Sequence, residues 1–546
     1  MDRHDIAAAL REVADWLDFE DDGKKSFRAR AYRKGADAIE QAAALESLIA
    51  EDRVTELPGI GAGLASLVAE LHRTGHAQQL DKLRADHPAG FLDIRNATGL
   101  SPLKIRALHD ALSISTLDEL SSAIASEQVR GVKGFSEASE QKLAEAIASA
   151  AAHSEEILRR DAEVIATRVI ESLAPSRVEV AGQLRRGLET IDLLELVTDD
   201  PAALDRFVDG SETEEHDSTS AMLRVREGLH VRLTVAPEGG FGSTLFATTG
   251  PDDHVDAVLA RAHHPLVTDE RELYAAARLP FIPPELRDAE SVIETADAGD
   301  AFDDLLVEAD IRGLVHCHTV YSDGKNTIEE MARAAEARGY DYLTITDHSP
   351  TAHYARGVEI DRLKRQWDEI AEVQEKVKIR LLRGTESDIT KDGSLDYPDA
   401  ILEQMDVVVA SIHNRYKLDR AEMTERIVRA MQVPVFKIWG HALGRILLER
   451  DPIDCDVERI FDVIAKSRAA VEVNGDPHRI DLPPHLVPLA RARGIQFVVS
   501  VDAHSTDALG HIRDGVLAAR RGGLRKGDVL NTRSAQAFLA AVRPAG

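Results

Sequence analysis

The sequence has few cysteines, a deficit of positive charge and no long hydrophobic run. Two cysteines in 546 residues, Cys317 and Cys455, exclude a disulfide framework and favour a reducing compartment. No apolar stretch is long enough to span a bilayer and no signal peptide is recognisable, so we expect a cytoplasmic protein without a membrane partner. Lys and Arg number 66 against 95 Asp and Glu, a formal net charge of −29. This balance disfavours general affinity for nucleic acid, although a local basic patch could still bind it.

The composition is that of a folded protein with several domains. Hydrophobic residues make up 44% of the chain and charged residues 29%. The patterns below predict two helical domains, 1–90 and 91–155, a mixed α and β domain, 156–300, and a domain of alternating strands and helices, 308–546. The acidic, small-residue stretch 288–310 is predicted to be a linker. We expect a monomer.

Metal-ligand residue types recur along the C-terminal region at the ends of short apolar runs. These β-branched runs are typical of buried parallel strands, and helical patterns separate them at the interval of a β/α barrel. Seven strands can be counted, and they lead into His316, His318, His348, Glu386, His413, His441, Asn474, Asp502 and His504. The C-terminal strand ends of a barrel meet at one face. Seven consecutive strand ends, nearly all with a ligand type, are hard to obtain by chance. His and carboxylate ligands without thiolate suit Zn, Mn or Fe.

The motifs in this region resemble those of PHP (polymerase and histidinol phosphatase) domains. They are His316-Cys317-His318, Tyr321-Ser322-Asp323-Gly324, Thr346-Asp347-His348, Gly384-Thr385-Glu386, Ser411-Ile412-His413, Gly440-His441 and Asp502-Ala503-His504. The resemblance implies a distorted (β/α)7 barrel holding two or three divalent metal ions. The implied ligands are His316, His318, Asp323, His348, Glu386, His413, His441, Asp502 and His504, and Glu386 could bridge two metals. Arg445 and Arg479 are candidate phosphate clamps, or equally ion-paired structural residues.

A basic cluster lies near the N-terminus. It contains Lys24, Lys25, Arg28 and Arg30, with aromatic residues interleaved. Basic and aromatic residues together are typical of a nucleic-acid surface. The alternative is a solvated helix face.

A glycine-rich turn between two helical patterns favours the first interpretation. The turn 57–64, with Gly59 and Gly61, resembles a helix-hairpin-helix motif, which binds the DNA backbone without regard to sequence. Weaker copies occur at 98–104, which ends in Lys104, and at 131–135. Each copy alone could be an ordinary helical turn, but three in one helical region favour DNA binding.

The middle of the chain resembles the nucleotidyltransferase core, the palm and thumb, of family X DNA polymerases. Gly182, Arg185, Arg186 and the pair Glu189-Thr190 match the family's order, and 241–250 and 274–287 match its later core. The whole chain therefore resembles bacterial family X DNA polymerases with a C-terminal PHP domain.

This core departs from the family at its reactive positions. Gln183 replaces the family serine, and the lyase lysine falls at Leu67. The three metal-binding aspartates fall at Leu193, Glu195 and Arg232. Asp192 is close, but strand alternation places it on the opposite face from Leu193 and Glu195. We therefore expect a degenerate core.

Together these features predict a metal-dependent phosphodiester hydrolase that acts on DNA. We expect it to trim 3′ ends as a 3′–5′ exonuclease in repair, using a water molecule activated by the metals. Three alternatives remain open: a small-molecule phosphatase of the histidinol-phosphate kind, an active DNA polymerase, and a non-catalytic DNA-binding scaffold.

Overall fold

The computed structural model describes residues 3–20, 27–40, 42, 45–88, 90–152, 156–209, 213–225, 229–263, 265–414 and 418–543. The chain forms two compact units, Met1–Ser154 and Glu155–Gly546. Within the described ranges no helix is both long and apolar enough to cross a membrane. The finer division into 1–90, 91–155, 156–300 and 308–546 stays a prediction.

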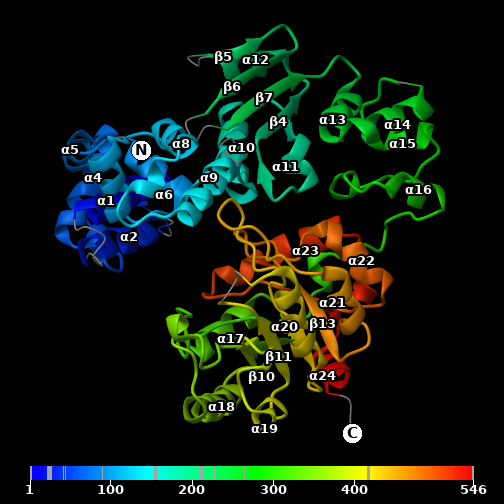
Figure 1. Cartoon of the computed structure of the whole chain (residues 1–546). Coiled ribbons are helices and arrows are strands. Elements are labelled where there is room, and N and C mark those ends of the chain that lie inside the picture. The colour runs from blue at the N-terminus through cyan, green and yellow to red at the C-terminus, as the bar shows by residue number, and fades with distance from the viewer. Residues whose placement is uncertain are drawn as a thin grey trace. The chain divides into compact units, whose positions relative to one another are not determined.

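The first unit is helical throughout its described residues (Figure 1). Its helices are α1 Arg3–Glu20, α2 Phe27–Glu40, α3 Leu45–Ala50, α4 Ala62–Thr74, α5 Gln78–Asp86, α6 Gly90–Thr98, α7 Pro102–Leu112, α8 Leu117–Ala125 and α9 Glu137–Ala152, with 3-10 turns η1 Val54–Glu56 and η2 Val129–Gly131. In α1, Ile6, Leu10, Val13 and Leu17 are fully buried, because their spacing puts them on one helix face.

The second unit begins with the mixed α and β core (Figure 1). Its elements are β1 Ile157–Leu158, α10 Arg159–Ser172, β2 Val178–Val180, α11 Gly182–Arg186, β3 Thr190–Ile191, β4 Leu193–Thr198, α12 Pro201–Val208, β5 Thr213–His216, β6 Ser220–Arg224 and β7 His230–Val235. The five-stranded sheet has the order β2-β4-β7-β6-β5. Strands β4 and β7 are parallel, which brings the residues at the family's aspartate positions side by side.

Helices then lead from the core to the barrel. They are α13 Phe241–Thr249, α14 Asp252–Ala262, α15 Glu270–Ala276 and α16 Val292–Asp297, with 3-10 turns η3 Pro284–Leu286 and η4 Glu308–Asp310. The prediction of a linker over 288–310 is wrong for much of this stretch. Helix α16 buries Val292 and Ala296 at helical spacing, and Phe302, Leu305 and Leu306 are buried as well. Composition hid these apolar positions among acidic residues.

The C-terminal region is a nearly closed barrel of seven parallel strands, which confirms the predicted fold. The strands are β8 Gly313–Leu314, β9 Tyr342–Ile345, β10 Arg380–Asp388, β11 Val407–Ser411, β12 Lys437–Trp439, β13 Ala469–Asn474 and β14 Phe497–Ser500. They pair in chain order from β8 to β14. A parallel bridge between Cys317 and Ala503, just beyond β8 and β14, joins the two edges. The amide of His318 donates to the carbonyl of Ala503 at 2.8 Å.

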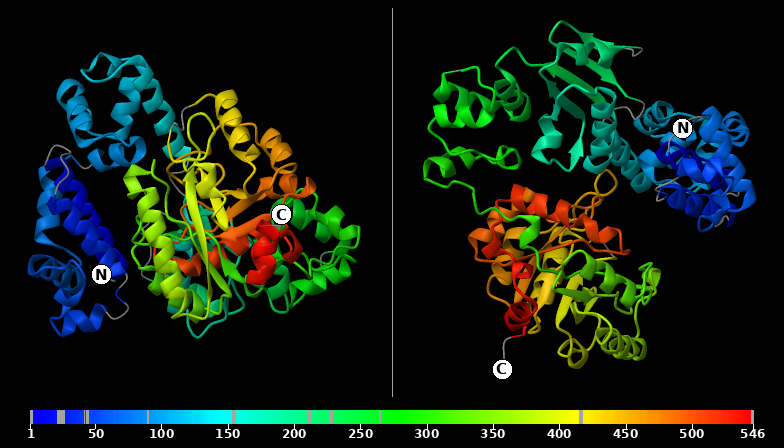
Figure 2. Two further views of the ribbon diagram at one scale, coloured as in Figure 1. Left: turned by 90° about the horizontal axis from the view of Figure 1, so that it is seen from below. Right: turned by 180° about the vertical axis from the view of Figure 1, so that it is seen from behind.

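Helices surround the strands of the barrel (Figure 2). They are α17 Ile328–Ala337, α18 Ile360–Gln374, α19 Asp399–Leu402, α20 Arg420–Gln432, α21 Val457–Ile464, α22 Val487–Ala492, α23 Ile512–Arg521 and α24 Ala535–Val542, with 3-10 turns η5 His353–Ala355, η6 Pro484–Leu486, η7 Ala508–His511, η8 Lys526–Asp528 and η9 Leu530–Thr532. The last helix packs against the strand beginnings, since Phe538 stacks on Tyr342 at a ring distance of 4.9 Å. The candidate metal ligands lie at the opposite end of the barrel, where the strands end.

Core and barrel pack against each other within the second unit. The buried Arg159 of α10 donates to Asp514 of α23 at 2.7 Å. Gly187 lies close to α23, since a Cβ there would be 2.8 Å from the Leu517 side chain. The barrel is therefore held by the core through specific contacts.

Candidate metal centre

Strand alternation explains how the barrel interior becomes polar at one end. Along β10, Leu382, Gly384, Glu386 and Asp388 all point inward, and Leu382 belongs to the apolar inner cluster near the strand beginnings. Glu386 therefore lies within the strand rather than after it. A Cβ on Gly384 would meet Thr344, Thr346 and the Val407 carbonyl at 2.9 Å, so glycine is needed beneath Glu386.

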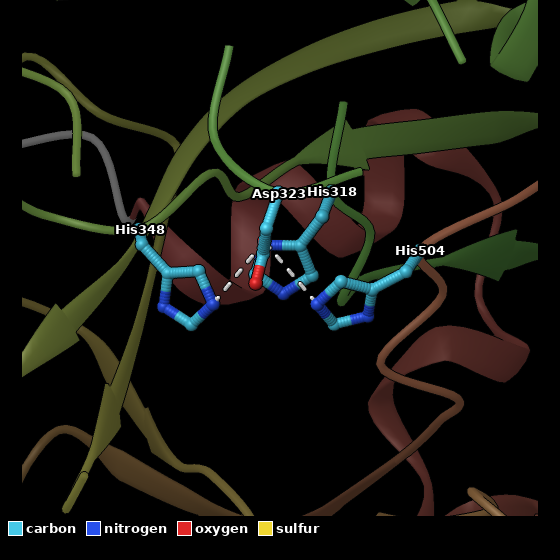
Figure 3. Close-up of side chains that lie close together, drawn as sticks. All are labelled: His318, Asp323, His348 and His504. Atoms are coloured by element: carbon cyan, nitrogen blue, oxygen red, sulfur yellow. Dashed lines mark ion pairs between the residues drawn. The ribbon is translucent and has the colours of Figure 1, made fainter. Parts of the chain in front are cut away.

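The structure brings all nine predicted ligands together at the C-terminal strand ends. Three overlapping groups have ligand atoms within 4.8 Å of one another: His318, Asp323, His348 and His504; His316, His318, Glu386 and Asp502; and His348, Glu386 and His413. Figure 3 shows the first group, in which Asp323 lies between His348 and His504. His441 joins through its Nε2, which lies 2.8 Å from Glu386 Oε1 and 3.2 Å from His413 Nε2.

Glu386 is at the centre of the arrangement. Its Oε2 lies 2.9 Å from His348 Nδ1 and 3.5 Å from His316 Nε2, while its Oε1 lies 3.1 Å from His413 Nε2. Burial favours the neutral acid, but the charges of the surrounding histidines hold the pKa of Glu386 well below its ordinary value. Glu386 is thus an anion shared between two ligand groups, which is the geometry of a bridging carboxylate.

The donor atoms of this cluster fit divalent metal ions. Among the described residues, buried atoms without a hydrogen-bond partner include His316 Nε2, both ring nitrogens of His318, Asp323 Oδ1, His348 Nδ1, Glu386 Oε2, His441 Nδ1 and Asp502 Oδ1. Buried polar atoms are almost always satisfied, so a concentration of orphans in one place indicates a missing partner. Imidazole nitrogens and carboxylate oxygens, with no thiolate in the set, suit Zn, Mn or Fe.

The histidines of the cluster differ widely in pKa. Burial lowers the pKa of His413, but the charges of Glu386 and Asp388 outweigh it and raise this pKa to about 10. Burial likewise opposes protonation of His504, yet Asp323 and Asp502 raise its pKa to about 9. Burial lowers the pKa of His318 to about 3, helped by the neighbouring imidazoles. Without metal, protons on His413 and His504 therefore balance part of the carboxylate charge.

Sequence reasoning missed the buried carboxylates behind the ligands. Glu472 on β13 accepts from His316 Nδ1 at 2.7 Å and from Asn474 Nδ2 at 3.0 Å. Asp388 accepts a hydrogen bond from His413 Nδ1. Such partners fix the ring orientation of a ligating histidine and raise its basicity. A charged residue at an inward position of a fully buried strand is the signal that could have found both.

The two candidate phosphate clamps differ. Arg445 Nη2 lies 3.0 Å from Glu189 of the core and also donates to the Ile480 carbonyl, which matches the structural alternative. Arg479 is nearer the metal cluster, with its Nε 3.9 Å from Asp502 Oδ2. Of the two, Arg479 is the better candidate to reach a phosphate.

The core positions are arranged very differently. Leu193 and Glu195 lie two residues apart on the same face of β4, and Glu195 is the direct cross-strand partner of Arg232 on β7. Arg232 Nη1 lies 3.9 Å from Glu195 Oε1, and Asp192 precedes the strand and is exposed. Burial raises the pKa of Glu195 although Arg232 opposes the shift. Gly182, at φ +57°, packs so closely that a Cβ there would lie 2.2 Å from Glu195 Oε2.

The remaining matched residues of the core are bound to other side chains. Arg185 donates to both carboxylate oxygens of Glu270, at 2.9 and 2.6 Å. Arg186 donates to Asp288 at 3.0 Å and to the Thr249 carbonyl at 2.6 Å. Gln183 Oε1 accepts from the Asp192 amide at 3.1 Å. The contacts of Arg185 and Arg186 connect α11 to α13, α15 and the segment after η3.

The predicted DNA-binding residues are only partly described. Lys24 and Lys25 lie outside the described residues. Arg28 is exposed and lies 3.6 Å from Glu20, and Arg30 is also exposed. Lys104 is exposed, with its Nζ 5.5 Å from the centre of the Phe135 ring.

Two of the three glycine-rich turns share one backbone design. After η1 the Ile60 amide donates to the Leu57 carbonyl at 3.1 Å, with Gly59 at φ +82°. After η2 the same bond joins 135 to 132 at 3.0 Å, with Gly134 at φ +96°. Gly61 then caps α4, and a Cβ there would meet nothing within 4 Å. The 98–104 turn instead places Gly99 at the end of α6.

Comparison with known proteins identifies the family. The "Helix-hairpin-helix domain" model matches residues 1–77, and the "PHP domain" model matches residues 315–476. The "DNA polymerase/3'-5' exonuclease PolX" of Bacillus subtilis (strain 168) is 31% identical over 577 aligned residues, covering 99% of each chain. The chain belongs to the PolX family. The expected family resemblance is thereby confirmed.

Other relatives of this PolX chain match less than half of it. A "probable phosphatase" of Thermoanaerobacter sp. (strain X514) is 27% identical over 232 residues, which are 40% of this chain and 89% of that protein. A "probable phosphatase" of Photobacterium profundum is 30% identical over 173 residues, 29% of this chain and 62% of that protein. PHP membership and these relatives support a hydrolytic enzyme that binds divalent metal, and the helix-hairpin-helix domain supports DNA binding.

Proposed function

We propose that this chain is a metal-dependent phosphodiesterase that trims DNA from its 3′ end, and that its core no longer polymerises. The observation that carries the proposal is the nine-residue cluster: His316, His318, Asp323, His348, Glu386, His413, His441, Asp502 and His504. Two of its three ligand groups share Glu386, and several of its buried donor atoms have no hydrogen-bond partner among the described residues. The 3′–5′ direction comes from the name of the Bacillus subtilis relative.

Two or three divalent ions, Mn, Zn or Fe, would be held by these nine residues. When bound, the ions would lower the pKa of a water molecule and neutralise charge on the phosphate. Glu472 would hold His316 in position by accepting a hydrogen bond from its Nδ1. Asp388 would hold His413 in the same way. Arg479 would bind a phosphate oxygen beside Asp502.

DNA would be held by the helical region without regard to sequence. Residues 1–90 would contribute Lys24, Lys25, Arg28, Arg30 and the turn with Gly59 and Gly61. Residues 91–155 would add Lys104 and the second turn of the same design, at Gly134. The open amides beyond a glycine-rich turn suit a phosphate, and binding of this type falls steeply with salt.

The proposed loss of polymerase activity rests on the side chains at three positions, Leu193, Glu195 and Arg232. Nucleotidyl transfer needs two metals held by acidic side chains. Leu193 cannot ligate a metal, and Arg232 brings a cation within 3.9 Å of Glu195, the one carboxylate of the three. That cation repels a divalent ion. The palm and thumb, 156–300, would then serve as a support for the barrel.

A nuclease assay tests this function. Purified full-length protein is given 3′-labelled and 5′-labelled single-stranded and recessed DNA, with Mn or Zn added separately after chelation. We expect products that shorten from the 3′ end, only when metal is present. Full activity in chelator, or shortening from the 5′ end alone, would contradict the proposal.

A small-molecule phosphatase is the second candidate, because relatives that match less than half of this chain are named probable phosphatases. It predicts that a chain without residues 1–154 hydrolyses phosphomonoesters as well as the parent does, and that DNA is a poor substrate for both.

A further inference from the structure

One exposed aromatic residue lies directly beside the metal centre. Tyr354 of η5 is 66% exposed, and it is the one aromatic among the exposed large apolar side chains of the described residues. Its ring lies 5.8 Å from the ring of His348 and 5.9 Å from that of His413, with interplanar angles of 66° and 57°. Both histidines are candidate ligands that share Glu386.

The loop that carries Tyr354 is fixed at both ends. The Val358 amide donates to the His348 carbonyl at 2.8 Å, and the Gly357 amide donates to the Ala352 carbonyl at 3.0 Å. A Cβ on Gly357 would lie 2.1 Å from the Ser349 carbonyl oxygen, so glycine is needed to close the loop. The loop 349–358 is thus a short closed turn at the end of β9.

The same loop is bonded to the metal centre through Asp388. Thr351 Oγ1 donates to Asp388 Oδ2 at 2.8 Å, while His413 donates to the other oxygen of that carboxylate. Asp388 therefore holds His413 and the Tyr354 loop together. These bonds fix the backbone that carries the exposed ring, so stacking on Tyr354 does not require the loop to be ordered first.

We infer that Tyr354 forms a nucleobase subsite, stacking on a base next to the phosphate that is hydrolysed. The inference rests on the proposed function, since it needs a DNA phosphate at the metal centre. An aromatic face can stack on any base. Such stacking contributes to binding and does not depend on the DNA sequence. A subsite of this kind would favour a nucleotide chain over a small phosphate ester.

The test compares DNA ends with and without a base. Four proteins are used: the parent, Tyr354→Ala, Tyr354→Trp and, as a matched control, Leu489→Ala, an exposed apolar residue on α22. Each receives single strands that carry either an ordinary nucleotide or a tetrahydrofuran abasic site at the last or the penultimate position. For the parent, we expect kcat/KM to be about tenfold higher with the ordinary nucleotide than with the abasic site at one of these two positions.

Tyr354→Ala should lose this preference while it hydrolyses the abasic strand as the parent does. Tyr354→Trp and Leu489→Ala should keep it. A strand with 2-aminopurine at the preferred position adds a direct signal, because stacking quenches its fluorescence: quenching by the parent should be largely lost with Tyr354→Ala.

Equal losses on base-containing and abasic strands, or unchanged preference and quenching in Tyr354→Ala, would overturn the inference. Failure of the proposed function is a separate outcome. In that case the parent hydrolyses no DNA with any metal, or Glu386→Ala hydrolyses DNA as well as the parent.

Discussion

The second unit contains two places where neighbouring parallel strands bring charged side chains together, and their chemistry is opposite. At the barrel, β10 and its neighbours bring carboxylates and imidazoles together, and several of their buried donor atoms have no hydrogen-bond partner among the described residues. In the core, β4 and β7 bring Glu195 against Arg232, and the charge is balanced within the protein. Similar backbone geometry therefore gives a cluster of metal-ligand residue types in one place and an internal ion pair in the other.

The comparison teaches that the side chains at neighbouring strands, and not the parallel pairing itself, decide whether a place can hold a metal. The core keeps the family's glycine and arginine positions, but Arg185 binds Glu270 and Arg186 binds Asp288. Glu189, from the same motif, binds Arg445 of the barrel. The matched motif is occupied by structural contacts, whereas the barrel's ligand set is complete.

The largest effect is expected from removing the shared carboxylate. Glu386→Ala should lower kcat for DNA by about a thousandfold or more, because two ligand groups lose an anion worth several kcal/mol in the transition state. Glu403→Ala, an exposed residue of the same barrel, is the matched control. Steady-state nuclease rates at saturating metal measure both. A loss below tenfold would mean that Glu386 is not shared by bound metals.

A smaller effect is expected behind the ligands. Glu472→Gln keeps the shape of the side chain but weakens the bond to His316 Nδ1, so metal affinity should fall by about 10- to 100-fold. Metal titration of the chelated protein, followed by calorimetry, measures the change. Unaltered affinity would show that this carboxylate has no part in the site.

DNA affinity tests the helical unit separately from the barrel. Replacing Lys24, Lys25, Arg28 and Arg30 by Ser should weaken DNA binding by about tenfold at low salt and flatten its salt dependence, because fewer counterions are released. Hydrolysis of a small chromogenic phosphodiester should stay unchanged. If the variant binds like the parent across a salt titration, the cluster is a solvated helix face.

The pH dependence of the metal-free protein follows from the raised histidine pKa values. The pKa of His413 is about 10 and that of His504 about 9, so protonation of these histidines stabilises the folded state. This stabilisation is fully present below their pKa values in the unfolded chain and is lost as the pH rises through 9 to 10. The melting temperature of the chelated protein should therefore fall by a few degrees from pH 7 to 10. Metal affinity should change in the opposite direction, because bound metal displaces these protons. Replacing His413 by Gln should reduce the fall, and an equal fall in that variant would contradict the assignment.

The smallest effect is expected in the core. Glu195→Ala and Arg232→Ala should leave DNA hydrolysis within about twofold of the parent, since neither side chain belongs to the barrel cluster. The same nuclease assay measures them. A tenfold loss in a well-folded variant would connect the core to the chemistry.

The sequence was sufficient for the barrel because its pattern repeats. Seven apolar runs, each leading to a ligand type, predicted the strands and the face where the ligands meet. The structural role of Arg445 depended on Glu189, which is 256 residues away, and no local pattern indicates such a pair. A carboxylate at an inward strand position is unusual, but the partners of Glu472 and Asp388, His316 and His413, are 156 and 25 residues away, so the local pattern does not show what these carboxylates bind. Helix α16 was missed because acidic residues surround its few apolar positions.

One gel tests the central claim, that the barrel hydrolyses DNA and the core does not extend it. A 5′-labelled primer on a gapped template is incubated with the full-length protein, all four nucleotides and Mn, beside Glu386→Ala and Glu195→Ala. We predict bands shorter than the primer with the parent and with Glu195→Ala, an unchanged primer with Glu386→Ala, and no longer band in any lane. Longer, template-dependent bands that disappear with Glu195→Ala would contradict the account.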